Sequence, residues 1–103
     1  MKIESKLVGG TLTVRLAGEL DESCAAEVRL ELDALIEKAD FKRMVLDFSS
    51  LTFMDSTGIG MLIGRYKLLH RAGIPLCIRS PLSAVDKILH LSGIYEIMPK
   101  IEF

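Results

Sequence analysis

Apolar and polar residues alternate over residues 11–16, within the second of two segments, 4–8 and 11–18, that we expect to be extended. A period of two predicts β-strands with one buried face. Gly9 and Gly10 separate the two segments, and a Gly-Gly dipeptide permits the positive φ angles of a tight turn. The sequence therefore predicts a β-hairpin at the start of the chain. The alternating apolar positions of its second segment are Leu12, Val14 and Leu16.

The apolar period then changes to that of a helix. Asp21 is a candidate N-cap for a helix starting at Glu22, because its carboxylate can accept hydrogen bonds from the unpaired amides of the first turn. Apolar residues then recur three and four positions apart, which predicts one buried helical stripe. This stripe consists of Ala25, Val28, Leu32, Leu35, Ile36 and Ala39.

Strands and helices continue to alternate in the rest of the chain. The predicted elements are a buried strand at 43–48, a loop at 49–55, a helix from Ser56 to about residue 72 with Gly73 as its stop, a strand at 74–79, a helix opened by Ser80-Pro81 and ended by Gly93, and a weak final strand at 95–98. The order ββαβαβαβ predicts an α/β fold with a mixed sheet of about five strands, in which helices connect the later, parallel strands.

Composition narrows the function classes. The 103 residues suffice for a single domain, 1–103, and half of them are apolar. A net charge of −1 provides no broad field toward nucleic acid or anionic lipid, so neither is an expected partner. No signal peptide or stretch long enough to span a membrane is evident, and we expect a cytoplasmic protein. Cys24 and Cys77 are too few for a disulfide framework and lack metal-ligand spacing, so we expect no metal.

Residues 53–60, with the sequence FMDSTGIG, are the most unusual segment. They follow the most apolar strand and open the second long helix, where functional loops gather in open α/β sheets. A hydroxyl in the first turn of that helix lies near unpaired amides and the positive end of the helix dipole. Ser56 is therefore either a helix cap or a functional serine, and the spacing alone leaves both open.

The segment Asp55-Ser56-Thr57-Gly58-Ile59-Gly60, preceded by Phe53-Met54 and followed by Gly64-Arg65-Tyr66-Lys67, resembles the STAS domains of bacterial anti-sigma factor antagonists. Gly18-Glu19-Leu20-Asp21 also resembles the loop between the second strand and first helix of that family. The resemblance covers essentially the whole chain and is strongest to the sporulation-type antagonists. Such proteins commonly carry a further helix after the last strand. Because the sequence ends at Phe103, we expect that helix to be short or absent.

The resemblance implies a partner-switching protein and not an enzyme. The unphosphorylated form would bind an anti-sigma factor that is also a serine kinase, and so release a sigma factor. The kinase would then phosphorylate Ser56 and end the interaction, and a serine phosphatase would reset the cycle. ATP belongs to the kinase, so no cofactor is expected for this chain. Asp21 would act as a helix cap only, or would also pair with a basic residue of the partner.

The helix that begins at Ser56 carries two apolar stripes. Ile59, Leu62, Ile63, Tyr66 and Leu69 are expected to face the sheet, while Thr57, Met61, Gly64 and Leu68 lie on nearly the opposite side. A surface helix does not need a second apolar stripe, so we expect docking there, with Met61 and Leu68 as contacts. The alternative is that a neighbouring helix covers it. The expected partner-binding residues are Asp21, Asp55, Thr57, Gly58, Met61, Gly64 and Leu68.

Other functions are less well supported by the residues. Ser56 lacks the Gly-x-Ser-x-Gly frame of hydrolases. A phospho-acceptor receiver built on Asp47 would need an acidic pair after the first strand, which is missing. The glycines after Ser56 miss the Gly-x-Gly-x-x-Gly frame of nucleotide-binding sites. The remaining alternative is a generic STAS phospho-switch module that serves another signalling complex.

Overall fold

A computed structural model describes residues 1–102 of the chain and shows an α/β fold with one five-stranded sheet. The elements are β1 (Lys2–Val8), β2 (Thr11–Leu20), α1 (Ala25–Lys38), β3 (Arg43–Met54), α2 (Ser56–Arg71), β4 (Leu76–Arg79), α3 (Ser83–Leu91), a 3-10 helix (Ile94–Glu96) and β5 (Lys100–Ile101). The strands lie in the order β1-β2-β3-β4-β5, with β1 antiparallel to β2 and the other pairs parallel. The predicted fold class is confirmed.

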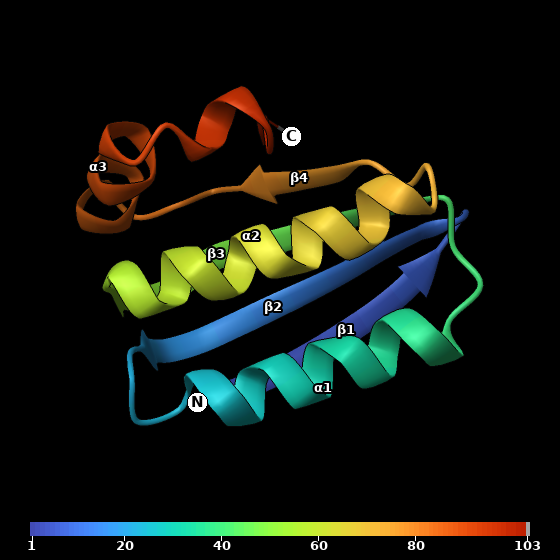
Figure 1. The fold of residues 1–103 in the computed structure, drawn as a ribbon, viewed down its shortest axis with the longest axis horizontal. Helices are drawn as coiled ribbons and strands as arrows, with labels where there is room; N and C mark the ends of the chain where they lie inside the picture. Colours follow the sequence, from blue (N-terminus) through green and yellow to red (C-terminus); the bar gives the residue numbers. More distant parts are fainter. Residues whose placement is uncertain (103) are drawn as a thin grey trace.

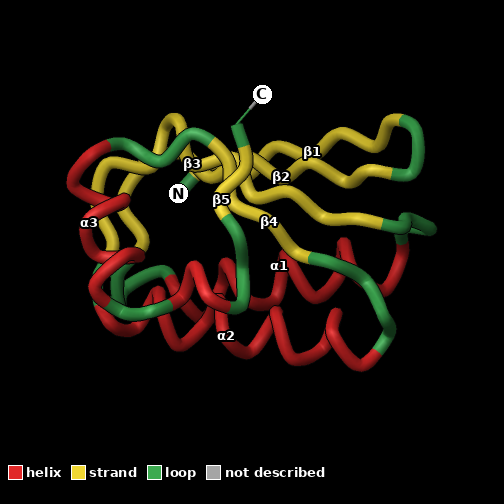
Figure 2. Tube along the Cα trace, turned by 90° about the horizontal axis from the view of Figure 1, so that it is seen from above, coloured by secondary structure: helices red, strands yellow, loops and turns green. Residues whose placement is uncertain are grey.

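Two layers make up the molecule. Helices α1 and α2 lie side by side against one face of the sheet, and α3 lies at one end of it (Figures 1 and 2). The side chains of β2 that alternate in the sequence, such as Val14 and Leu16, are fully buried in the core under these helices, together with Val28 and Leu32 of α1. At the predicted hairpin, Gly9 and Gly10 have φ angles of +57° and +80°, a turn for which glycine is suited.

Strand β3 is longer than predicted. The expected loop at 49–55 is wrong for residues 49–54, because β3 continues to Met54. Ser50 pairs with Ala17 and Met54 pairs with Leu20, so the neighbouring strand satisfies the backbone of this stretch, with shifts of register on the way. The extension carries the chain directly to the start of α2.

Other predicted boundaries are also corrected. Helix α3 begins at Ser83, after its N-cap Leu82, and not at Pro81. Helix α1 begins at Ala25 and not at Glu22, because residues 21–24 form a turn in which Asp21 accepts hydrogen bonds from Ser23. The final strand is not at 95–98. That segment starts in a 3-10 helix, and the last strand is β5, which pairs with Ile78 and Arg79 of β4. The end of the chain at Phe103 lies outside the described residues.

Candidate functional site

The site lies where strands β2 and β3 end and helix α2 begins. Asp55 is the N-cap of α2, since its Oδ1 accepts hydrogen bonds from the amides of Thr57 at 3.0 Å and Gly58 at 3.3 Å. Ser56 is therefore the first residue of the helix and not its cap, so the capping alternative is wrong. Its side chain is exposed, and its hydroxyl makes no hydrogen bond with the described residues.

Close packing fixes the position of this helix start. A Cβ atom on Gly58 would lie 2.8 Å from Cγ of Met54 and 3.1 Å from Cγ of Leu20. The amide of Asp55 also donates to the carbonyl oxygen of Leu20, at 3.4 Å. Because a side chain at position 58 would have to displace Met54 and Leu20, glycine allows the first turn of α2 to rest directly on the ends of β2 and β3. Gly58 is buried and is thus a positioning residue beneath the surface.

The surroundings of Ser56 are acidic. Leu20 and Met54 are paired across β2 and β3, so Asp21 and Asp55, which follow them, extend from adjacent strand ends. Glu19 and Glu22 are exposed beside Asp21, and neither residues 18–24 nor residues 50–60 contain a basic side chain. We call Glu19, Asp21, Glu22 and Asp55 the acidic rim.

Asp21 is held as a carboxylate by its own turn. Its Oδ1 accepts from the hydroxyl of Ser23 at 2.5 Å and from the amide of Ser23 at 2.9 Å. These two hydrogen bonds keep the pKa of Asp21 below its usual value. The expected role of Asp21 as the cap of α1 is wrong, because the residue at that position is Cys24, whose side chain does not cap the helix.

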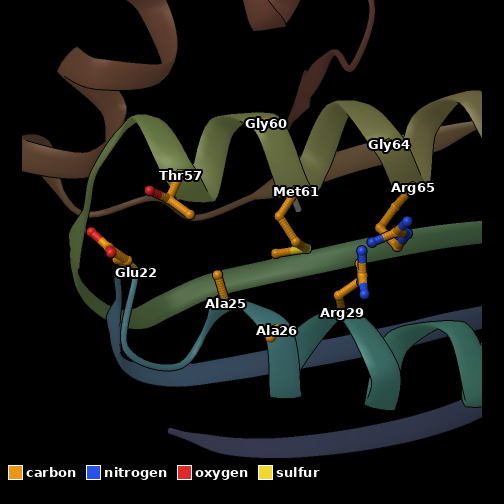
Figure 3. Close-up of a pocket in the computed structure, with 9 residues that line it drawn as sticks. All are labelled: Glu22, Ala25, Ala26, Arg29, Thr57, Gly60, Met61, Gly64 and Arg65. Atoms are coloured by element: carbon orange, nitrogen blue, oxygen red, sulfur yellow. The ribbon is translucent and has the colours of Figure 1, made fainter.

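A groove of about 490 Å³ runs between α1 and α2 and starts at Thr57, the residue that follows Ser56 (Figure 3). Thr57 and Glu22 lie at its near end, and Arg29 and Arg65 lie at its far end. The residues that line it are Glu22, Ala25, Ala26 and Arg29 of the loop and α1, and Thr57, Gly60, Met61, Gly64 and Arg65 of α2.

The residues of the predicted second stripe of α2 differ in their exposure. Thr57 is exposed and lines the groove with Gly64. Met61 also borders the groove, but it is only 8% exposed and its side chain belongs to the core. The expectation that Met61 is a docking contact is thus corrected: α1 packs beside α2 and covers it, as the alternative proposed. Leu68 remains 40% exposed, near the other end of the helix.

Sequence patterns missed the residues at the far end of the groove. Arg65 is 8% exposed, and its Nε lies 2.8 Å from Oδ1 of Asp33 on α1. The sequence signal that could have revealed this pair is the position of Arg65 directly after Gly64, at the edge of the second stripe of α2. The helix spacing alone does not show which helix lies opposite.

No helix within residues 1–102 combines the length and the apolar character needed to cross a membrane. In the same residues, no three His, Cys, Asp or Glu side chains are grouped as metal ligands would be.

Comparison with known proteins identifies the family. The model of the STAS domain family matches residues 2–102. The chain is 37% identical over 99 residues to an anti-sigma F factor antagonist of Paenibacillus polymyxa, which covers 96% of this chain and 85% of the relative. It is 26% identical over 98 residues to the anti-sigma-B factor antagonist of Bacillus subtilis, with 95% and 88% covered.

Solved structures show the same fold. The unphosphorylated anti-sigma factor antagonist SpoIIAA superposes with a TM-score of 0.81 at 27% identity, over 97% of this chain and 88% of that chain. The phosphorylated form of the Bacillus cell fate determinant SpoIIAA superposes with a TM-score of 0.70 at 27% identity, over 97% and 91%.

Proposed function

Because the chain belongs to the STAS domain family, among relatives that are anti-sigma factor antagonists, we propose that it binds an anti-sigma factor and thereby frees a sigma factor. The anti-sigma factor is also a serine kinase, which phosphorylates Ser56 and so ends the interaction. A serine phosphatase restores the binding form. The protein works in the cytoplasm as a binding partner, and ATP is bound by the kinase.

The observation that carries this proposal is the state of the Ser56 side chain. Its hydroxyl is exposed and has no hydrogen-bond partner among the described residues. Asp55 satisfies the unpaired amides of the first turn, so Ser56 is not needed as a cap. A serine that is rigidly placed, accessible and free of a structural task is suited to modification by another protein.

The acidic rim explains why a phosphate would act as a switch. Phosphoserine adds a charge of about −1.5 to −2 at neutral pH. A partner that binds this end of the molecule must face Asp21, Asp55 and their acidic neighbours, and a basic partner side chain opposite Asp21 would meet that requirement. A bulky dianion in the middle of the interface removes the close fit. A penalty of about 3–4 kcal/mol would lower the affinity several hundredfold.

The docking surface that we propose combines three parts. Ser56 and Thr57 form its centre, the acidic rim forms one side, and the groove with Gly64 forms the other side. Leu68 extends it along α2 as an exposed apolar contact. Gly58 contributes by holding the helix start in place.

The test is a phosphorylation assay with the anti-sigma F factor of Paenibacillus polymyxa, the target named for the 37% identical relative, in the presence of ATP. We expect the wild-type protein to gain the mass of one phosphate and to lose binding. Ser56→Ala should bind without gaining mass, and Ser56→Asp should bind poorly.

Thr57→Ala is the matched control, because it removes the neighbouring exposed hydroxyl from the same helical turn. This variant should still be phosphorylated. Phosphate on Thr57 in place of Ser56, or full binding by Ser56→Asp, would contradict the proposed switch.

A further inference from the structure

We propose that the groove between α1 and α2 receives a segment of the anti-sigma factor that carries an acidic side chain, and that Arg29 and Arg65 bind this carboxylate. The inference rests on the proposed function, because it concerns the same partner. It adds a second recognition site, at the opposite end of the groove from Ser56, and a chemical requirement on the segment that docks there.

Two glycines of α2 leave space that the protein itself does not use. Gly60 and Gly64 lie within the helix, where glycine is less favourable than alanine. A Cβ atom on either residue would have no heavy atom within 4 Å, and neither residue has a positive φ angle. Internal packing therefore does not require glycine at these positions, in contrast to Gly58. Both face the groove, opposite the small side chains of Ala25 and Ala26, so another chain can approach closely.

Arg65 provides an independent sign of a ligand. Its side chain is only 10% exposed and lines the groove, yet Nη1 is buried without a hydrogen-bond partner among residues 1–102. Asp33 lies 2.8 Å from Nε and compensates the charge, but the N–H is not aligned for a hydrogen bond. Buried donors are nearly always paired, and an unpaired one is unfavourable. A carboxylate that entered beside Arg65 would supply the missing acceptor.

Arg29 places a second positive charge at the same end. It extends from α1 toward Arg65 (Figure 3) and forms no ion pair or hydrogen bond through its side chain with the described residues. Arg29 and Arg65 together with Asp33 carry a net charge of +1. Two like charges across a narrow groove repel each other, and an anion between them relieves this repulsion.

The two ends of the groove consequently carry opposite charges. Glu22 and the rest of the acidic rim lie at the Ser56 end, and Arg29 and Arg65 lie at the other. Thr57 and Arg65 are eight residues apart in α2, a distance of about 12 Å along the helix. The docked segment should therefore present a basic residue near Ser56 and an acidic residue about 12 Å further on. This polarity fixes the direction in which the segment binds.

Variants of the groove test the inference in a binding titration with the anti-sigma F factor of Paenibacillus polymyxa and unphosphorylated protein. Gly64→Leu places a bulky side chain in the groove, starting from a Cβ atom that meets no heavy atom within 4 Å. Arg29→Glu reverses the exposed charge without replacing Arg65 or Asp33, the two partners of the ion pair. Each should weaken binding by about tenfold or more, as expected for central interface positions. In a scan of acidic residues of the partner, one lysine variant should restore binding to Arg29→Glu.

The controls make the same chemical changes elsewhere. Ala84→Leu adds bulk to an exposed position of α3, and Lys38→Glu reverses an exposed charge in the last turn of α1. Both should bind within about twofold of the wild type. Undiminished binding by Gly64→Leu or Arg29→Glu, with binding still lost in Ser56→Asp, would overturn the groove proposal and leave the proposed function standing. If the wild-type protein did not bind the anti-sigma factor at all, both proposals would fall.

Discussion

Asp55 and Ser56 divide two tasks, helix capping and modification, that the sequence left as alternatives for Ser56. Both are short polar residues that favour the start of a helix. The structure gives the capping role to Asp55, whose Oδ1 accepts from two amides, and leaves the hydroxyl of Ser56 exposed. This separation matters for the proposed switch, because the carboxylate that stabilises the helix start is not the group that is modified.

This division predicts the effects of substitutions at Asp55. Asp55→Ala removes the cap and should lower the free energy of unfolding by about 1 kcal/mol. Asp55→Asn keeps an acceptor oxygen, so its free energy of unfolding should stay within about 0.5 kcal/mol of the wild-type value. Urea titration followed by circular dichroism measures both values. A loss of stability in Ser56→Ala similar to that in Asp55→Ala would contradict the assignment of the cap.

At the scale of the element, helix α2 contains glycines with different tasks. Gly58 is placed where a Cβ atom would collide with Met54 and Leu20, at the contact between the helix and the strand ends. Gly60 and Gly64 face outward into the groove, where nothing restricts a side chain. Three glycines within seven residues thus combine one close internal contact with an open external surface.

The difference can be measured as stability. Gly60→Ala and Gly64→Ala should each raise the free energy of unfolding by about 0.5–1 kcal/mol, because alanine is the better helix former and meets no obstacle. Gly58→Ala should lower it by about 1–3 kcal/mol, since a methyl group must displace packed side chains. Thermal unfolding of the three variants under the same conditions distinguishes them. Equal stabilisation at all three positions would show that the contact at Gly58 is not tight.

At the scale of the whole molecule, the proposed switch changes a surface and not the scaffold. The core lies between the sheet and the two helices α1 and α2, and no part of it depends on the Ser56 hydroxyl. A phosphate at the first position of α2 lies at the positive end of the helix dipole, where negative charge is stabilising. The acidic rim opposes part of this gain.

We therefore expect phosphorylation to leave the fold intact. The free energy of unfolding of the protein phosphorylated on Ser56 should lie within about 1 kcal/mol of that of the unmodified protein. This is the size of the effect of a single charge near a helix end. Calorimetry gives this comparison, and hydrogen exchange should show protection unchanged in β2, β3 and α1. Global unfolding, or loss of protection throughout the sheet, would mean that the switch works by disrupting the scaffold.

Local signals in the sequence determined the class of fold and the position of the candidate serine. Periods of two and of about 3.6 residues depend on which side of a single element is buried, so they predicted the α/β order, the hairpin at Gly9-Gly10 and the helix that begins at Ser56. The motif around Ser56 added the family, which the comparisons confirmed.

Contacts between distant segments determined the rest, and only the tertiary structure shows them. Strand β3 continues to Met54 because β2 offers hydrogen bonds beside it, and β5 exists because β4 offers an edge. Met61 is buried because α1 lies against α2, which no periodicity within α2 can reveal. The same packing brings Arg29 and Arg65 to one end of a groove. Burial and charge pairing across elements depend on their relative placement, and that placement is a property of the folded chain.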